Sequence, residues 1–119
     1  MKKSLLLLAF ASLSLFGCTV MVPPSQVISK GVAFEFNSSK SALNMEGCII
    51  NGLRQTVLIK PTSARVEGSS RVYGELMEQL VIVVDISEAP NGSIVKYYKD
   101  FSYVLASEEV FEKAVKSCQ

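Results

Sequence analysis

Alternating apolar and polar residues predict a series of β-strands in the middle of this chain. Val32, Phe34 and Phe36 alternate with Ala33, Glu35 and Asn37, a period of two that is typical of a strand with one buried face. Residues 56–59 are β-branched or apolar and Pro61 follows them, so a short strand that the proline interrupts is expected there. Further strands are expected at 65–67 and 71–73, on either side of a polar turn, and from 76 through the apolar positions of 80–86.

The strongest turn signal is Ala89-Pro90-Asn91-Gly92, with proline at the second and glycine at the last position of a type I turn. It predicts a hairpin that leads into a strand over residues 94–104. Alternation places one set of side chains together on one face of this strand: Val95, Tyr97, Lys99, Phe101 and Tyr103. The opposite face carries Ile94, Lys96, Tyr98, Asp100 and Ser102. Lys96 and Tyr98 are therefore a candidate partner-binding pair, while an amphipathic strand half covered by its neighbours explains the same pattern.

A spacing of three and four residues predicts two helices. The first has an apolar stripe after the capping residues Ser38 and Ser39, and Gly52 would end it as a left-handed cap; the stripe is Ala42, Met45, Ile49 and Leu53. Alternatively, Asn51-Gly52 is a hairpin turn between residues 47–50 and 53–59.

The second helix closes the chain. Ser107 caps it, Glu108 and Glu109 lie in its first turn, and its apolar stripe is Val110, Phe111, Ala114, Val115 and Cys118. Glu112 and Lys116 on its outer side have the spacing of an ion pair, as do Glu109 and Lys113. Together these elements predict an α+β domain, a small antiparallel sheet of about four or five strands with two helices packed on one face. The alternative is a mostly β sandwich in which only the C-terminal helix forms.

The N-terminus has the pattern of a secretory signal. Lys2 and Lys3 precede an uncharged apolar run from Leu5 to Phe16, which is shorter than the roughly 20 residues that a membrane span needs. The run ends in Leu15-Phe16-Gly17-Cys18, which resembles the lipobox of bacterial lipoproteins. This resemblance implies that residues 1–17 are removed and that Cys18 carries the lipid anchor. By the family's sorting convention, Thr19 after the cysteine implies the outer membrane rather than the inner membrane.

Residues 18–30 would then be a lipidated tether, extended because it contains Pro23-Pro24 and no helical period, and residues 31–119 would form the single domain. The chain of 119 residues has room for little more than one domain. Loss of Lys2 and Lys3 with the signal leaves nearly balanced charge, and the remaining basic residues are scattered. The sequence therefore predicts no nucleic-acid surface.

The cysteine count adds a covalent constraint. With Cys18 acylated, Cys48 and Cys118 remain, and the compartment beyond a secretory signal is oxidising. We therefore expect a structural disulfide between Cys48 and Cys118 that joins the two helices, with free thiols as the alternative. Neither cysteine lies in a Cys-x-x-Cys motif, and two cysteines without histidine fall short of a zinc site.

No motif in the chain points to catalysis or to a cofactor. The chain has no histidine, its glycines form no phosphate-binding loop, and its acidic residues show no spacing typical of a catalytic pair. We therefore expect no enzyme activity, no cofactor and no metal. Two functions remain. The first is a membrane-anchored envelope lipoprotein that binds another envelope protein or serves as a structural accessory module. The second is a small carrier or sensor of an apolar or glycan ligand.

Overall fold

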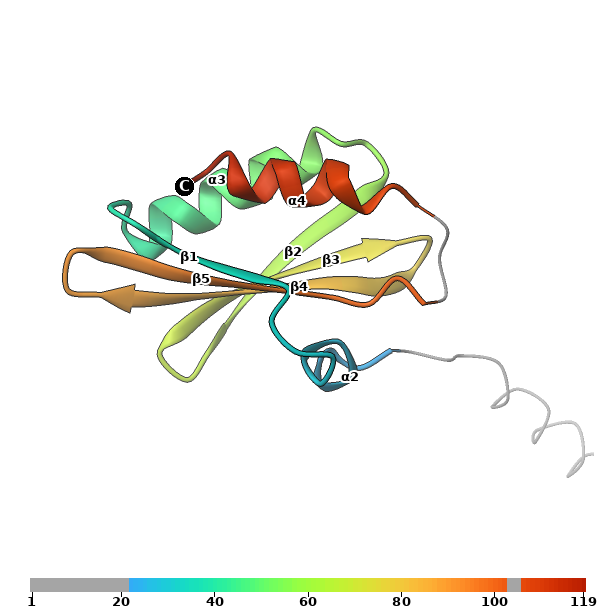
Figure 1. The fold of residues 1–119 in the computed structure, drawn as a ribbon, viewed down its shortest axis with the longest axis horizontal. Helices are drawn as coiled ribbons and strands as arrows, with labels where there is room; N and C mark the ends of the chain where they lie inside the picture. The colour runs from blue at the N-terminus through green and yellow to red at the C-terminus, as the bar shows by residue number, and fades with distance from the viewer. Residues whose placement is uncertain (1–21, 103–105) are drawn as a thin grey trace, which may run out of the picture.

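A computed structural model describes residues 22–102 and 106–119 of the protein. Five strands form one antiparallel sheet: β1 (Phe34–Ser38), β2 (Ile59–Val66), β3 (Ser69–Leu76), β4 (Gln79–Ala89) and β5 (Gly92–Lys99). Their spatial order is β1-β5-β4-β3-β2, so β1 and β2 are the edges. The helices α3 (Ala42–Arg54) and α4 (Glu108–Lys116) cover one face, and the short helix α2 (Pro24–Ile28) lies on the other (Figure 1). The predicted α+β fold is thus confirmed, and the sandwich alternative is wrong.

The core lies between the sheet and the two longer helices. Helix α3 contributes Met45, Ile49 and Leu53, and α4 contributes Phe111 and Val115, all of them with at most 1% of their surface exposed. They pack against the sheet positions Val72, Ile82, Val84, Ile86, Val95 and Tyr97. These are alternate positions on β3, β4 and β5, as expected for a sheet with one face buried under helices.

The predicted disulfide is present. It joins Cys48 of α3 to Cys118, two residues after the end of α4, with the two Cα atoms 5.9 Å apart. Cys118 is 1% exposed and belongs to the core, in agreement with its place on the apolar stripe.

Helix α3 begins and ends differently from the prediction. Its N-cap is Ser41, whose side chain accepts a hydrogen bond from the amide of Asn44, rather than Ser38 or Ser39. The helix does not stop at Gly52 but continues to Arg54, so the alternative Asn51-Gly52 hairpin is also wrong. Gly52 faces α4 instead, where a Cβ atom would come within 3.2 Å of the backbone oxygen of Ala114. The glycine therefore serves the close approach of the two helices.

Three strand boundaries also differ. Strand β2 begins at Ile59 and contains Pro61, which an edge strand tolerates because one side of its backbone needs no partner. The stretch from Leu76 is divided by a two-residue turn at Met77 and Glu78, between β3 and β4. Strand β5 ends at Lys99, five residues before the expected end, and residues 103 and 104 of the expected strand lie outside the described residues.

The predicted extended tether is wrong for its last part. Residues 24–28 form α2, which begins with a proline at its first position, and the side chain of Val27 is fully buried. Helix α2 packs on β4 and β5, on the sheet face opposite α3 and α4. The reason is that Val83, paired with Tyr98 of β5, points to that face and needs cover from water; its side chain is fully buried.

Candidate partner-binding surface

The sheet face opposite α3 and α4, here called the polar sheet face, carries a row of charged residues across four strands. Glu35 of β1 lies opposite Lys96 of β5, which lies opposite Asp85 of β4, which lies opposite Arg71 of β3. The signs therefore alternate across the row. Opposite charges on directly paired positions stabilise a sheet by about 0.2 to 1 kcal/mol each, so this charge row also favours the observed register.

Arg71 and Asp85 form the inner part of the charge row. The Nε atom of Arg71 lies 3.5 Å from Oδ2 of Asp85, and their side chains are only 25% and 20% exposed. Arg71 Nε and Asp85 Oδ1 are shielded from solvent and have no hydrogen-bond partner within the described part of the chain. The pair therefore joins β3 to β4 beneath the surface of the polar sheet face.

Lys96 and Tyr98, the predicted binding pair, both lie on the polar sheet face. Lys96 is the centre of the charge row, between Glu35 and Asp85. Tyr98 belongs to the next row along the strands, opposite the buried Val83. Both side chains are half-buried. The structure thus places the two residues side by side on the face away from the core, and their contact with a partner stays a prediction.

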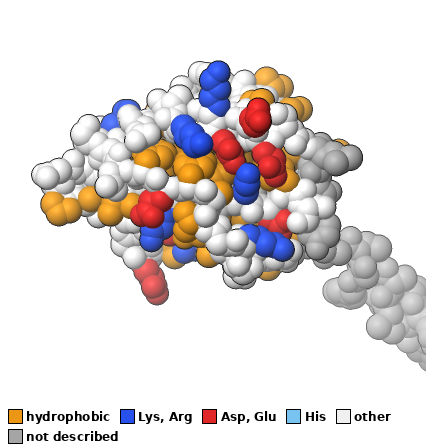
Figure 2. Space-filling model, viewed as in Figure 1, with side chains coloured by type: hydrophobic (Ala, Val, Ile, Leu, Met, Phe, Trp, Pro, Cys, Tyr) orange, Lys and Arg blue, Asp and Glu red, His pale blue; other side chains and the backbone are white. Residues whose placement is uncertain are grey.

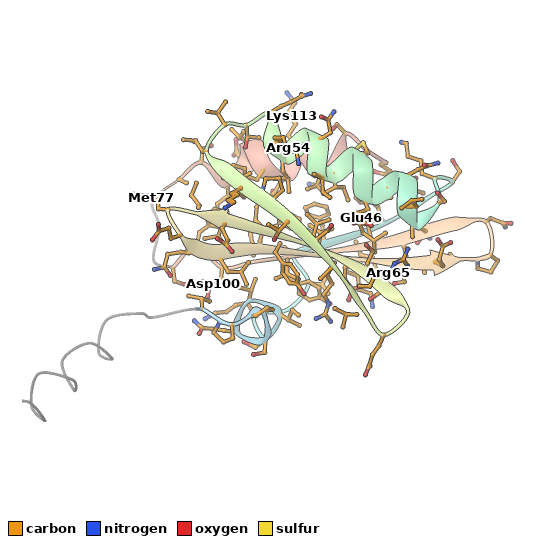
Figure 3. All side chains as sticks on the ribbon, turned by 180° about the vertical axis from the view of Figure 1, so that it is seen from behind. Glu46, Arg54, Arg65, Met77, Asp100 and Lys113 are labelled. Atoms are coloured by element: carbon orange, nitrogen blue, oxygen red, sulfur yellow. A yellow bond between two sulfur atoms is a disulfide. The ribbon has the colours of Figure 1, made fainter. Side chains whose placement is uncertain are left out.

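Asp100 explains why β5 ends where it does. Its carboxylate accepts hydrogen bonds from the amide and the hydroxyl of Ser102, at 3.0 Å and 2.5 Å, which turns the chain out of the strand direction. These two bonds lower the pKa of Asp100, with smaller contributions from Lys30 and Gln26 at the N-terminal end of the described chain. Figure 3 shows Asp100 beside α2. Asp100 therefore links the end of β5 to α2, the short helix that packs on one part of the polar sheet face.

On the opposite, helix-covered face, Lys99 forms an ion-pair cluster that sequence reasoning missed. Its ammonium lies 2.7 Å from Glu112 Oε1 and 3.3 Å from Glu108 Oε2, so it ties β5 to α4. The hydrogen bond that Lys99 donates to Glu112 is the main reason that the pKa of Lys99 is raised. The signal was present in the sequence, because a lysine at a core-facing strand position needs an acidic partner.

The Lys99 cluster changes the expected pairing on α4. Glu112 pairs with Lys99, while the ammonium of Lys116 lies 4.6 Å from the centre of the Phe34 ring. The predicted pairs of Glu112 with Lys116 and of Glu109 with Lys113 are therefore both wrong, since neither is among the ion pairs of the described residues. Burial, followed by the charges of Glu112 and Glu108, raises the pKa of the Tyr97 phenol far above its ordinary value, so this hydroxyl stays neutral.

Glu46 anchors α3 to β3 and β2. The hydroxyl of Ser70 donates a hydrogen bond to its carboxylate and lowers its pKa, and Ser63 and Arg65 of β2 act in the same direction. Figure 3 shows Glu46 on α3 and Arg65 near the turn between β2 and β3. These groups hold elements together, and nothing in their arrangement resembles an acid and base placed for proton transfer.

Two surface hollows accompany these features. One, of about 430 Å³, lies at the turn between β4 and β5 and is lined by Asn37, Ser38, Ser39, Pro90 and Asn91 among others. The other, of about 230 Å³, lies where α2 begins and is lined by Val22, Pro24, Thr62, Tyr73, Glu75 and Leu80. Within the described residues, no three His, Cys, Asp or Glu side chains are grouped so as to hold a metal ion.

Comparisons of the chain with protein-family models, with curated proteins and with solved structures found no match. Across residues 22–102 and 106–119, no helix has both the length and the apolar character to cross a membrane. Cys18, the predicted lipidation site, lies outside the described residues.

Proposed function

We propose that the protein is a lipid-anchored bacterial envelope lipoprotein whose domain binds another envelope protein without catalysing a reaction. Residues 1–17 are the signal peptide, and Cys18 carries the lipid. The single observation that carries the proposal is the sequence Leu15-Phe16-Gly17-Cys18 after a short uncharged apolar run. Thr19 favours the outer membrane.

The disulfide supports this location. Cys48 and Cys118 are joined to each other, and a bridge of this kind persists in compartments that are oxidising. The chain has three cysteines, so Cys18 is the one left over. An unpaired cysteine in an exported protein calls for a chemical explanation, and acylation of its sulfur supplies one.

The polar sheet face supports partner binding. Its charge row alternates in sign, which favours a partner with the complementary order of charges and disfavours one with the opposite order. Figure 2, in the view of Figure 1, shows basic and acidic side chains interspersed on the visible surface. The alternative function as a carrier has no comparable support. A carrier would need space for its ligand between the sheet and the helices, and there the buried side chains pack into one cluster.

Mass spectrometry of protein extracted from host membranes tests the anchor. The expected product begins at Cys18 and carries acyl chains, and it fractionates with outer-membrane markers. A Cys18→Ser variant, the matched control, should remain uncleaved and unacylated. Recovery of the parent chain as a lipid-free soluble form would refute the proposed anchor, and recovery with inner-membrane markers would refute the proposed sorting.

Crosslinking in the native host tests the binding surface. Lys96→Gln removes the central positive charge of the row, and Lys113→Gln removes a charge from exposed α4 on the other side of the sheet, as Figure 3 shows. Partner recovery should fall with Lys96→Gln and stay at the parent level with Lys113→Gln. Equal recovery from both variants would show that the polar sheet face is not the binding surface.

A further inference from the structure

Three large apolar side chains are exposed together at one end of the sheet. Val57 and Leu58, in the connection from α3 to β2, are 87% and 67% exposed, and Met77, in the turn from β3 to β4, is 81% exposed. Ile59 pairs with Leu76, so Leu58 and Met77 are the next positions outward along the same two strands. We call Val57, Leu58 and Met77 the apolar tip. Figure 2 shows hydrophobic side chains exposed over the α3–β2 connection.

The backbone of the apolar tip is unusual for such residues. Val57 has φ 68°, and Met77 and Glu78 have φ 53° and 65°. A β-branched residue is costly in this left-handed region, and two-residue turns of this kind ordinarily use asparagine and glycine. Smaller polar residues would fit this backbone better and expose less apolar surface. Strain and apolar exposure at the same place point to a role for the side chains themselves.

The described N-terminal chain begins toward the same end of the sheet as the apolar tip. Val22 and Pro24 line one hollow together with Glu75 and Leu80, which are paired across β3 and β4 just before and just after the Met77–Glu78 turn. In Figure 1, the start of α2, the α3–β2 connection and the β3–β4 turn lie toward the same end of the molecule. Figure 3 labels Met77 at that end, seen from behind.

The distance to the lipid anchor follows from the length of the chain. Cys18 precedes Val22 by four residues, so the two Cα atoms can be at most about 14 Å apart. An acylated Cys18 lies at the membrane surface. The end of the domain that carries the apolar tip is therefore the end nearest to the bilayer.

We propose that the apolar tip docks on the membrane that carries the lipid anchor and inserts its side chains among the lipid headgroups. This inference rests on the proposed acylation of Cys18. The anchor holds the tip at a high local concentration beside the bilayer, so three side chains can orient the domain although they would not bind a membrane alone. Arg54 and Lys60, both exposed, flank Val57 and Leu58 along the chain and add positive charge that favours anionic lipid headgroups. Glu78 in the same turn is exposed, and because a charged side chain is costly in the hydrocarbon, it keeps the turn at the depth of the lipid headgroups.

Docking in this way leaves the partner surface free. The turn between β4 and β5 lies at the opposite end of the sheet from the turn between β3 and β4 (Figure 1) and would point away from the bilayer. The charge row crosses the strands between the two ends and would face sideways, where a second envelope protein can reach it.

Tryptophan fluorescence tests the docking, because the chain contains no tryptophan. Leu58→Trp places the only indole in the apolar tip, and Leu43→Trp is the matched control. Leu43 is a leucine of nearly the same exposure, 66% against 67%, at the start of α3. The full chain, purified from host membranes, is placed in vesicles of phosphatidylethanolamine and phosphatidylglycerol with brominated acyl chains. We expect a blue-shifted emission and several-fold stronger quenching for Leu58→Trp than for Leu43→Trp.

The intact mass of the protein in the same vesicles separates the two proposals. If Cys18 is acylated and Leu58→Trp is quenched no more than Leu43→Trp, the docking inference fails while the anchor stands. A blue shift that grows with protein density without bromine quenching would indicate contact between copies and would also overturn the inference. If Cys18 carries no lipid, the proposed anchor and the docking fail together.

Discussion

Removal of the Cys48–Cys118 disulfide should lower the free energy of unfolding by about 4 kcal/mol in the limit of pure chain entropy. The two cysteines are 70 positions apart, so the bridge closes a loop of 71 residues counting both ends. For a loop of this length, the restriction of the unfolded chain corresponds to about 4.4 kcal/mol at 25 °C. Residual structure in the unfolded state reduces this figure. We therefore expect about 2 to 4 kcal/mol for Cys48→Ser or Cys118→Ser.

The double variant provides the sharper test. Either single substitution already opens the bridge, so Cys48→Ser combined with Cys118→Ser should be no less stable than either single variant. Cys118 is 1% exposed, and each single variant leaves one thiol beside a hydroxyl in its place. Any loss of stability in addition to that caused by opening the bridge is therefore expected to be small.

Urea unfolding of the parent and the variants, followed by circular dichroism, measures these differences. Cys18→Ser is the matched control, because it removes the third cysteine, lies outside the bridge and should leave the unfolding midpoint unchanged. The slope of the transition should increase on loss of the bridge, since the unbridged chain exposes more surface when it unfolds. Variants that unfold at the parent midpoint, or free thiols at both positions in protein from the envelope, would refute the reasoning.

Three other perturbations follow from the structure. A Cβ at Gly92, which has φ 149°, would overlap the backbone oxygen of Ser38, so Gly92→Ala should lower the free energy of unfolding by at least about 2 kcal/mol. Gly68 has φ 80° and open space around it, so Gly68→Ala should lower it by only about 1 kcal/mol in the same urea assay. Equal losses of stability in the two variants would contradict the overlap. Val57→Asn should raise the unfolding free energy by about 1 kcal/mol, because asparagine tolerates positive φ, and a lower midpoint would contradict the strain. Because the folded-state pKa of Asp100 is below its ordinary value of 3.8, its carboxylate stabilises the fold above pH 3.8 and loses this contribution as the pH falls through the folded-state pKa. The free energy of unfolding, measured from pH 6 to pH 2, should therefore depend less on pH in Asp100→Asn than in the parent. Parallel pH profiles of the two proteins would contradict this.

Short-range patterns predicted those elements whose stabilising interactions lie within a few residues. The alternation at Phe34 and Phe36, the turn at Pro90 and Asn91, and the C-terminal helix were all confirmed, because periodicity and turn chemistry are local properties. The turn at Met77 was missed because neither residue of the turn is one that ordinarily adopts positive φ.

Gly52 and Pro61 show why other local signals misled. A glycine near the end of a helical stripe normally indicates a cap, yet Gly52 is required by the closeness of Ala114 in a helix more than fifty residues away along the chain. Pro61 would interrupt an inner strand, but β2 is an edge. Whether a strand is an edge depends on the complete sheet, which is not a property of the strand's own residues.

For the candidate surface, the sequence by itself determined the side of the strand on which Lys96 and Tyr98 lie, since side chains alternate with a period of two whatever the neighbours are. The signal pattern, and the two cysteines that remain once Cys18 is set aside, likewise predicted the bridge between Cys48 and Cys118. Only the tertiary structure decided that Lys96 lies between Glu35 and Asp85, and that Lys99 meets Glu112. Such partners depend on strand order, register and helix placement, which are set by how the whole chain buries its apolar surface rather than by any segment alone.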